Sequence, residues 1–385
     1  MIYLDAAATT PVRPEVLETV WPLLTTDFGN PSSRHGAGES AARALAYARR
    51  TAAEVLGVRD GDIVFTSGGT ESNNLALKGL ALAEPRGRHL VSTAVEHSSV
   101  RGALDYLVRH HGFTLDVVSV DGLGRVDEQA LAAAVRPDTT LVSVMAVNNE
   151  VGTVQPVQAA AAVARSAGAR FHTDAVQAAG WLDLAPLAAV ADALSLSGHK
   201  AGGMKGAGLL MLRGRLGAEP ILHGGGQERG RRSGTENVAG AVATATALRL
   251  AAEATASGGP EDGYGDYLRR AVLDGLGSGA SAGTVRAVAT GDPVDRVPGI
   301  VSFCFPGTAG EAVLLELERR GVQCSSGSAC HAGSDEPSPV LLAMGFDADT
   351  ALTAVRFSFT RQVKEAEMTT AARATVASVR AVAGG

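Results

Sequence analysis

The fold class is indicated by residues 140–173, which read TLVSVMAVNNEVGTVQPVQAAAAVARSAGARFHT. This stretch opens with an apolar strand pattern at 140–147 and closes with another at 170–173. Between them, 156–167 is an alanine-rich helical pattern that has proline at its start and Gly168 just after its end, as these residues favour. Strand, helix and strand in this order predict a βαβ unit, from which parallel sheets are built.

The same alternation covers most of the chain before residue 260. Helical patterns occur at 38–56, 73–84, 98–111, 127–135, 156–167 and 237–256. Strand patterns occur at 62–67, 89–93, 114–120, 140–147, 170–173, 193–197 and 208–212. The sequence therefore predicts an α/β fold with a large domain built on a mainly parallel seven-stranded sheet.

A smaller α/β domain is expected beyond a cluster of turn-forming residues at 257–263. A chain of 385 residues exceeds the roughly 250–300 at which a single core stops growing, so two domains are expected. The second domain is predicted to hold helices at 264–276, 310–320 and 364–382, strands at 299–305 and 355–360, and a loop at 277–291. We assign residues 15–260 to the large domain, and residues 1–14 together with 261–385 to the small one.

Composition and charge exclude several classes of protein. Hydrophobic residues make up 45% and charged residues 19%, which excludes a disordered or collagen-like chain. The 34 Lys and Arg against 40 Asp and Glu leave a net charge of −6 without a basic stripe, so no direct nucleic-acid binding is expected. No apolar run approaches the ~20 residues of a membrane helix, and residues 1–5 show no secretory pattern, so we expect neither a membrane partner nor export.

The cysteines point to the compartment. The chain has three cysteines, Cys304, Cys324 and Cys330, and no CxxC pair. A disulfide framework is therefore not expected, and a reducing cytoplasm fits better. Because neither HExxH nor paired CxxC spacing occurs, we also expect no metal site.

A first candidate for chemistry is the stretch 65–72, FTSGGTES, between a predicted strand and a predicted helix. Gly68 and Gly69 let the backbone approach an anion closely, and the free N–H groups of a helix start would bind a phosphate. The stretch matches neither a Walker loop nor a GxGxxG fingerprint. The alternative is an ordinary strand–helix turn capped by Ser or Thr.

Two further candidates end predicted strands. Lys200 follows SLSGH, residues 195–199, at the edge where open α/β sheets bind ligands, and its alternative is a solvated surface lysine. Asp174 ends a buried strand and needs a cationic partner there, unless it caps the following turn. Together, a phosphate loop, a lysine and an aspartate are the protein groups that pyridoxal 5'-phosphate (PLP) requires.

The chain resembles the cysteine desulfurases of the NifS/IscS type, members of the class V aminotransferase family with the fold type I PLP architecture. The likeness covers almost the whole chain. Besides the motifs above, it is carried by YLD at 3–5, ATTP at 8–11, GNPSS at 29–33 and RFS at 356–358.

The resemblance implies roles at the PLP site. Lys200 corresponds to the Schiff-base lysine that also moves a proton, Asp174 to the partner of the ring nitrogen, and Gln177 to the partner of the ring hydroxyl. His97, in the Glu-His motif, corresponds to the histidine that stacks on the ring and assists proton transfer. The phosphate-binding positions are matched by Gly69, Thr70, Ser197 and His199.

Three more positions match groups that complete the site. Thr235 corresponds to a residue that the neighbouring subunit contributes to the phosphate, so the resemblance implies a homodimer. Asn149, which is also among the cofactor-contacting positions, and Arg356 correspond to the groups that receive the substrate carboxylate. An arginine suits that task because its planar guanidinium binds a carboxylate through two parallel hydrogen bonds.

Cys330 distinguishes the desulfurases from plain aminotransferases. Five small residues, SSGSA at 325–329, precede it, so we expect a mobile and exposed loop. In the family such a cysteine attacks the substrate sulfur as a thiolate. A small loop residue without chemistry is the alternative, while Cys304 is expected in the core and Cys324 in a structural role.

The resemblance implies a PLP-dependent enzyme that converts L-cysteine into L-alanine and leaves a persulfide on Cys330. An iron–sulfur scaffold or another sulfur carrier would accept the sulfur, for iron–sulfur cluster assembly or tRNA thiolation. Alternatives are a selenocysteine lyase, a transaminase, which needs no mobile cysteine, and a non-enzymatic scaffold, which would be expected to lack the lysine, aspartate or cysteine. Met204 stands where the family commonly has proline, and His331 where it more usually has a small hydroxyl residue.

Overall fold

The computed structural model describes residues 1–277, 285–327 and 336–384. Its largest sheet has seven strands in the order β2-β8-β7-β6-β5-β3-β4. β8 runs antiparallel to both of its neighbours, and the other described pairs of this sheet are parallel. The strands are β2 (Ile63–Thr66), β3 (His89–Thr93), β4 (Thr114–Val118), β5 (Thr139–Ser143), β6 (Arg170–Asp174), β7 (Ala193–Ser197) and β8 (Gly208–Leu212). The predicted mainly parallel seven-stranded sheet is confirmed.

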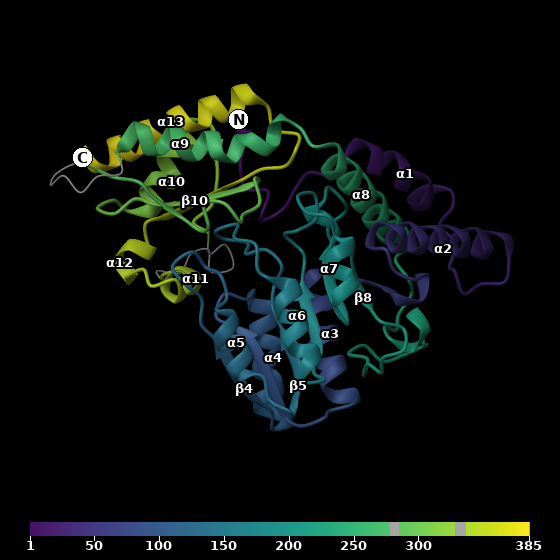
Figure 1. Ribbon diagram of the computed structural model, residues 1–385. Coiled ribbons are helices and arrows are strands. Elements are labelled where there is room, and N and C mark those ends of the chain that lie inside the picture. Colours follow the sequence, from purple (N-terminus) through teal and green to yellow (C-terminus); the bar gives the residue numbers. More distant parts are fainter. Residues whose placement is uncertain (278–284, 328–335, 385) are drawn as a thin grey trace.

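Helices cover both faces of this sheet (Figure 1). One face packs under α3 and α4, whose Leu75 and Leu104 share a core cluster with Leu210 of β8. On the other face, Leu45 of α2 and Ala245 of α8 belong to a larger core. Because both faces are covered, strands such as β5, β7 and β8 are buried along their whole length. The helices are α1 (Pro14–Thr25), α2 (Gly36–Leu56), α3 (Gly69–Ala83), α4 (Ser98–His111), α5 (Glu128–Ala134), α6 (Val157–Ser166), α7 (Ala185–Val190) and α8 (Val238–Ser257).

The C-terminal third builds a second, smaller layer of helices on a sheet, at the upper left of Figure 1. Its three-stranded antiparallel sheet has the order β12-β10-β9 and shares a core with α9 and α13, in which Phe303, Phe357 and Leu268 are buried. The elements are α9 (Tyr264–Leu276), β9 (Val288–Thr290), β10 (Ile300–Cys304), α10 (Gly310–Arg319), β11 (Val322–Gln323), α11 (Pro339–Ala343), α12 (Ala348–Ala351), β12 (Ala354–Ser358) and α13 (Glu365–Gly384).

The N-terminal segment connects the two layers. β1 (Ile2–Tyr3) pairs in parallel with β11, and Ala6 N donates to the carbonyl of Ser358 on β12. A few residues later Thr10 N donates to the carbonyl of His199, beside the large sheet, and α1 then packs on α8. Residues 5–10, called the N-terminal strap below, therefore cross from the small sheet to the large one.

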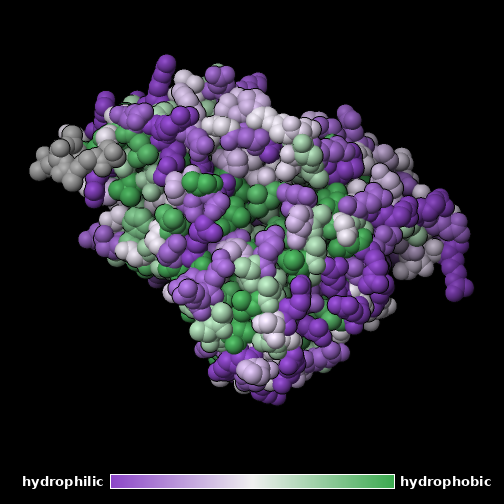
Figure 2. Space-filling view, in the orientation of Figure 1, coloured by the Kyte–Doolittle hydropathy of each residue, from purple (hydrophilic) through white to green (hydrophobic). Residues whose placement is uncertain are grey.

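Apolar side chains gather in the middle of the face seen in Figure 2, between more hydrophilic zones. At the junction of the two layers, Trp181 packs against both cores and meets Phe359 edge to face at a centroid distance of 5.9 Å. Gly299 passes directly beneath this ring, since an added Cβ would lie 2.2 Å from it. None of the helices in the described parts of the chain is both long and apolar enough to cross a membrane.

The structure corrects one sequence prediction and adds elements that were not predicted. Residues 277–291 were predicted to be a loop, but Val288–Thr290 within them forms strand β9. This strand pairs antiparallel with β10, with Thr290 opposite Ser302 and Val288 opposite Cys304. A three-residue strand carries too short an alternation to be seen in sequence. The helix α1 was also not predicted; a proline inside it, Pro22, obscures its periodicity.

Candidate active site

A cavity of about 340 Å³ lies at the carboxyl ends of the parallel strands. β6 ends at Asp174 and β7 at Ser197, and both side chains line the cavity because parallel strands finish at the same edge of a sheet. The lining includes one glycine and twelve polar or charged side chains from the large sheet's side of the cavity. They are Gly69, Thr70, Asn73, Glu96, His97, Ser99, Asn149, Glu150, Asp174, Gln177, Ser197, His199 and Lys200, and Arg356 joins them from the small sheet.

The start of α3 forms a close-packed cradle at one end of this cavity. An added Cβ on Gly69 would lie 2.9 Å from Val176 Cγ2 and 3.5 Å from Ser197 Cβ, so glycine is needed there. Gly208 at the start of β8 approaches the same loop, and its Cβ would lie 2.7 Å from Gly68 Cα. The loop thereby presents the free N–H groups of a fifteen-residue helix to the cavity, an arrangement suited to a phosphate.

His199 stands beside this cradle as a neutral side chain. Its Nδ1 forms a 3.0 Å hydrogen bond with Thr9 Oγ1 on the N-terminal strap. Burial, followed by the neighbouring charges of Lys200 and Lys205, lowers the pKa of His199 to about 4. At neutral pH it offers a hydrogen bond rather than a positive charge.

Asp174 is the anion of the site. Its Oδ2 accepts a 2.7 Å hydrogen bond from Asn73 Nδ2, and its Oδ1 accepts one of 3.0 Å from Val176 N. Among the described residues no cationic side chain lies within ion-pair distance of it, so the cationic partner expected from the sequence is not a residue of the described chain. A buried carboxylate on the cavity wall without a counter-ion fits a protonated ring nitrogen of a bound group.

Two buried neighbours of Asp174 are uncharged at neutral pH. Burial, with a smaller effect of Asp174, raises the pKa of Glu96 to about 8, so Glu96 holds its proton. His172 lies on β6 between Ser143 Oγ at 2.9 Å and Ser195 Oγ at 3.0 Å, and burial lowers its pKa to about 3. Neither of these two side chains adds a charge beside Asp174 at neutral pH.

His97 is positioned through a short network that begins at Asp174. It caps the start of α4, where its Nδ1 accepts from Ser99 N at 3.2 Å and lies 2.7 Å from Ser99 Oγ. Asn73 Nδ2 donates to both Ser99 Oγ and Asp174. Sequence reasoning did not identify Asn73 or Ser99; the available signal was an asparagine one turn into the helix that follows the glycine loop.

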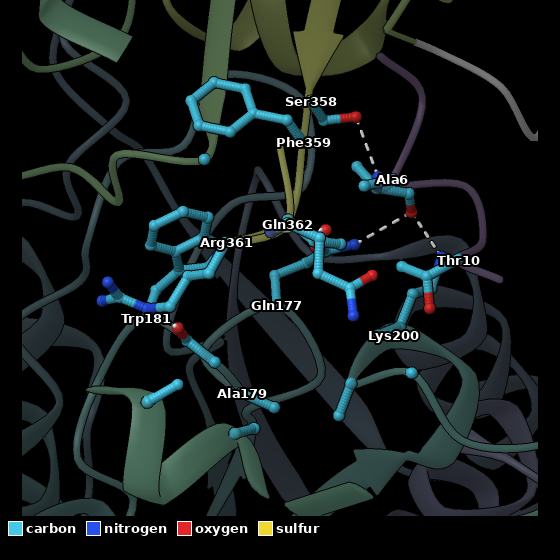
Figure 3. Close-up of a pocket in the computed structure, with 18 of the residues that line it drawn as sticks. Ala6, Thr10, Gln177, Ala179, Trp181, Lys200, Ser358, Phe359, Arg361 and Gln362 are labelled. Carbon is cyan, nitrogen blue, oxygen red and sulfur yellow. Dashed lines mark hydrogen bonds between the residues drawn. The ribbon is translucent and has the colours of Figure 1, made fainter. Parts of the chain in front are cut away.

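Lys200 ends a 3-10 turn, Gly198–Lys200, directly after β7. Its Nζ donates to the carbonyls of Ala7 and Ala8 on the N-terminal strap, with 2.6 Å to Ala8. Gln177 Nε2 donates to the same Ala7 carbonyl at 3.1 Å, so both side chains meet at the strap (Figure 3). Lys200 and Gln177 also line a smaller hollow of about 70 Å³ beyond the strap, beside Trp181 and Arg361.

Arg356 is fully buried on β12 and reaches the cavity from the small sheet. Its Nη1 donates to the carbonyls of Asn149 and Gly327, both at 3.0 Å. Its Nη2 donates to Asp5 Oδ1 at 2.9 Å. The structure thus brings Asn149 and Arg356 together, as a carboxylate-binding pair requires, although the contact runs through the Asn149 backbone.

The remaining predicted residues lie elsewhere. Thr235 lines a separate hollow of about 160 Å³ that also includes Ser67 and Arg232, and it does not line the cavity of Lys200. Cys330 is outside the described residues. Cys304 is buried, and burial raises the pKa of its thiol to about 12; burial also raises the pKa of the Cys324 thiol.

The residues of the cavity fit PLP. The cradle at Gly69 suits its phosphate, the unpaired carboxylate of Asp174 its ring nitrogen, Gln177 its ring hydroxyl, and the Lys200 amine its aldehyde. These groups, together with the fold, define a fold type I PLP-dependent enzyme.

Comparisons with known proteins agree with this class. The model of the family described as Aminotransferase class-V matches residues 2–370. A cysteine desulfurase of Cereibacter sphaeroides is 44% identical over 368 residues, covering 95% of this chain and 92% of that protein. The cysteine desulfurase IscS of Methanosarcina thermophila is 40% identical over 361 residues, covering 94% and 87%.

Solved structures give the same result. A NifS-like protein has a TM-score of 0.87 at 34% identity, with 98% of each chain covered. The structure described as SspA in complex with cysteine has a TM-score of 0.80 at 33% identity, covering 93% of this chain and 99% of that one. The chain therefore belongs to the class V aminotransferase family, in its cysteine desulfurase branch. The predicted family, fold and PLP dependence are confirmed.

Proposed function

We propose that this protein removes the sulfur atom of L-cysteine, releases L-alanine, and holds the sulfur as a persulfide on Cys330. One observation carries the proposal: Asp174, Lys200 and Arg356 line a single cavity although they come from different parts of the chain. A carboxylate, an amine and a guanidinium are the groups needed for the ring nitrogen, the aldehyde and the substrate carboxylate. The solved relative described as a complex with cysteine supports the choice of substrate.

In this proposal Gly69, Thr70, Ser197 and His199 hold the phosphate, while Asp174 and Gln177 hold the ring and His97 covers it. When bound, PLP withdraws electrons from the Cα atom of the substrate and so makes its proton acidic. Asp174 keeps the ring nitrogen protonated because a buried carboxylate stabilises a neighbouring positive charge. Glu96, which holds its own proton at neutral pH, does not compete for that charge.

Lys200 moves the proton. Its amine takes the proton from Cα of the substrate and gives it up again later in the reaction, and His97 assists these transfers. The two strap carbonyls that accept from Nζ orient the amine while it is not bonded to another group. Arg356 and Asn149 hold the substrate carboxylate during these transfers.

The sulfur transfer is assigned to Cys330. Its thiolate attacks Sγ of the substrate, the new S–S bond forms as the Cβ–Sγ bond breaks, and the electron pair of the broken bond stays on the substrate carbon. Cβ is then protonated, and the desulfurated substrate is released as L-alanine. Cys304 and Cys324 do not suit this role because burial raises the pKa of both thiols.

The wider setting is part of the proposal. We infer a homodimer in which Thr235 of one subunit completes the phosphate site of the other, since Thr235 lies outside its own chain's cavity. The sulfur acceptors would be an iron–sulfur scaffold or a sulfur carrier for tRNA thiolation, in the cytoplasm. The division into a domain of residues 15–260 and one of 1–14 with 261–385 also stays a prediction.

The test is to supply the purified PLP-loaded protein with L-cysteine and a reductant, and to measure sulfide and L-alanine. Equal amounts of both are expected. Cys330→Ala should lose sulfide release by a factor of at least about 10² while PLP and its spectral response to cysteine are retained. Undiminished sulfide release from that variant would show that another group accepts the sulfur.

The same assay separates the alternatives. 3-Mercaptopyruvate formed with transfer of the amino group to the cofactor would indicate a transaminase, and turnover restricted to selenocysteine would indicate a selenocysteine lyase. A protein that binds no PLP and turns over neither substrate would be a non-enzymatic scaffold. Lys200→Ala provides the matched control, since it should abolish the covalent link to the cofactor and all turnover.

A further inference from the structure

Arg356 has a particular set of unused hydrogen-bond donors. A guanidinium carries five N–H donors. Three are used: two on Nη1 by the carbonyls of Asn149 and Gly327, and one on Nη2 by Asp5 Oδ1. Nε has no partner among the described residues. The two that remain, Nε–H and one N–H of Nη2, equal the number that a bidentate carboxylate takes.

Asp5 is the carboxylate that balances this buried cation. Among the described residues it is the ion-pair partner of Arg356, at 2.9 Å, and the arginine side chain is only 2% exposed. An uncompensated guanidinium at that depth would be strongly unfavourable, and it would turn toward any other acceptor within reach. Asp5 therefore occupies one N–H of Nη2 and holds the guanidinium in this orientation before a substrate binds.

The backbone holds Asp5 in register with Arg356. Asp5 forms an isolated parallel bridge with Ser358, two residues after Arg356 on β12. Ser358 N donates to the Leu4 carbonyl, Ala6 N donates to the Ser358 carbonyl, and Ala7 N donates to Ser358 Oγ. Because the two side chains project from backbone segments that are hydrogen-bonded to each other, their relative position is set by the backbone (Figure 3 shows Ser358 beside this segment).

We propose that Asp5 is a positioning residue for the substrate carboxylate: it fixes the guanidinium of Arg356 so that two donors stay available to an amino-acid carboxylate. This inference rests on the proposed function, in which Arg356 receives that carboxylate. It adds a residue of the N-terminal strap to the determinants of substrate specificity. The same strap holds Lys200 through Ala7 and Ala8, so one segment sets both the carboxylate end and the reacting end of the substrate site.

The experiment compares a ligand that has a carboxylate with one that lacks it. L-Alanine and L-alaninamide are titrated against the PLP-loaded Asp5→Ala protein, and binding is followed by the absorption spectrum. We expect L-alanine to bind about tenfold more weakly than to the wild type, since a hydrogen-bonded charge contact is lost, and L-alaninamide to bind within twofold. The KM for L-cysteine should rise by a similar factor while kcat changes by less than twofold.

Two variants serve as controls. Asp5→Asn keeps an acceptor oxygen at the same place and should restore most of the L-alanine affinity. Asp262→Ala removes the carboxylate of another pair, Arg361 to Asp262 at 2.8 Å. Neither residue lines the 340 Å³ cavity, so the binding of both ligands should be unaffected. Thermal unfolding of each variant shows that the protein remains folded.

The outcomes separate this inference from the proposed function. If Arg356→Lys leaves the preference for L-alanine over L-alaninamide unchanged, Arg356 is not the carboxylate receptor and the proposed role fails. If Arg356→Lys abolishes the preference but Asp5→Ala preserves it, only the role of Asp5 is overturned. Equal weakening of both ligands by Asp5→Ala would also overturn it, because a positioning effect acts through the carboxylate alone.

Discussion

Glu96 is a carboxyl group held in the protein interior beside the cofactor site. Its Oε1 accepts from Thr93 Oγ1 at 2.9 Å and from Met145 N at 2.8 Å, and its Oε2 has no partner among the described residues. This arrangement suits a protonated acid, consistent with a pKa raised by burial to about 8. Between about pH 4.5 and 8 the folded protein therefore binds a proton at Glu96 that the unfolded chain has released, so stability falls as pH rises.

We expect Glu96→Gln to remove this pH dependence. The amide keeps the shape of the acid but does not ionise. The melting temperature of the variant should therefore exceed that of the wild type by an amount that grows from pH 5 to pH 8. Near pH 4.5 the two should unfold together. Thermal unfolding followed by circular dichroism at several pH values provides the measurement, and melting curves with a constant difference across this range would contradict the prediction.

The thiols should differ in reactivity in the folded protein. Cys304 and Cys324 have thiol pKa values raised by burial, and only the thiolate is alkylated. Iodoacetamide at pH 7 is therefore expected to label Cys330 and to leave the other two unmodified, whereas all three react in denaturant. Peptide mass spectrometry identifies the sites, and rapid native labelling of Cys304 would show that its strand opens readily.

At the scale of the element, the glycine loop and the start of β8 depend on each other. A Cβ on Gly208 would meet Gly68 Cα at 2.7 Å and the Leu196 carbonyl at 2.8 Å, both of them backbone atoms that cannot turn aside. Gly208→Ala should displace the loop, with a loss of about 1–3 kcal/mol in stability and a fall in PLP affinity of about tenfold. Fluorescence titration of the apoprotein with PLP measures the affinity.

A matched control for this loop is Gly102→Ala in α4. Nothing lies within 4 Å of the Cβ that this substitution adds. Because alanine favours a helix interior over glycine, the variant should gain about 0.5–1 kcal/mol in stability. Its PLP affinity should match that of the wild type. If Gly102→Ala loses as much PLP affinity as Gly208→Ala, the loss in Gly208→Ala cannot be attributed to displacement of the glycine loop.

The elements of the large sheet were predictable from sequence because most of its strands are short, rich in apolar residues and separated by helical patterns. Thus 193–197 and 208–212 were predicted with the bounds that the structure has. The site was predictable only where motifs carry the chemistry, as at Lys200 and Asp174. Asp5 and Asn73 were not predicted, since their roles come from contacts with residues 351 and 101 positions away in the sequence.

At the scale of the whole molecule, the position of Thr235 predicts that active sites are shared between subunits. A mixed dimer of one Lys200→Ala chain and one Thr235→Ala chain would contain one intact site if Thr235 acts across the interface. The Thr235→Ala homodimer should bind PLP about 10- to 100-fold more weakly than the wild type, because a hydrogen bond to the charged phosphate is lost. The mixed dimer, in contrast, should recover about half of the wild-type sulfide release. Differently tagged chains allow the mixed dimer to be isolated.

The control for this experiment pairs Lys200→Ala with Asp174→Ala. Both residues line the same cavity of one chain, so no arrangement of the two variants in a dimer restores an intact site. Recovery in this pair as well would mean that Lys200 of one subunit and Asp174 of the other form one site. Failure of the Thr235 pair to recover would mean that Thr235 does not act across the interface.

The pairing of β1 with β11 and the bond from Asp5 to Arg356 have a consequence for biosynthesis. Ile2 pairs with Val322, so β1 leaves the ribosome some 320 residues before its partner strand is made. At about 5–20 residues per second, that interval lasts roughly a quarter of a minute to a minute. The sheet that carries Lys200 can form earlier in translation, but the substrate site closes only after β12 with Arg356 has been made. Nascent chains therefore gain the capacity to bind an amino acid after the large sheet is complete.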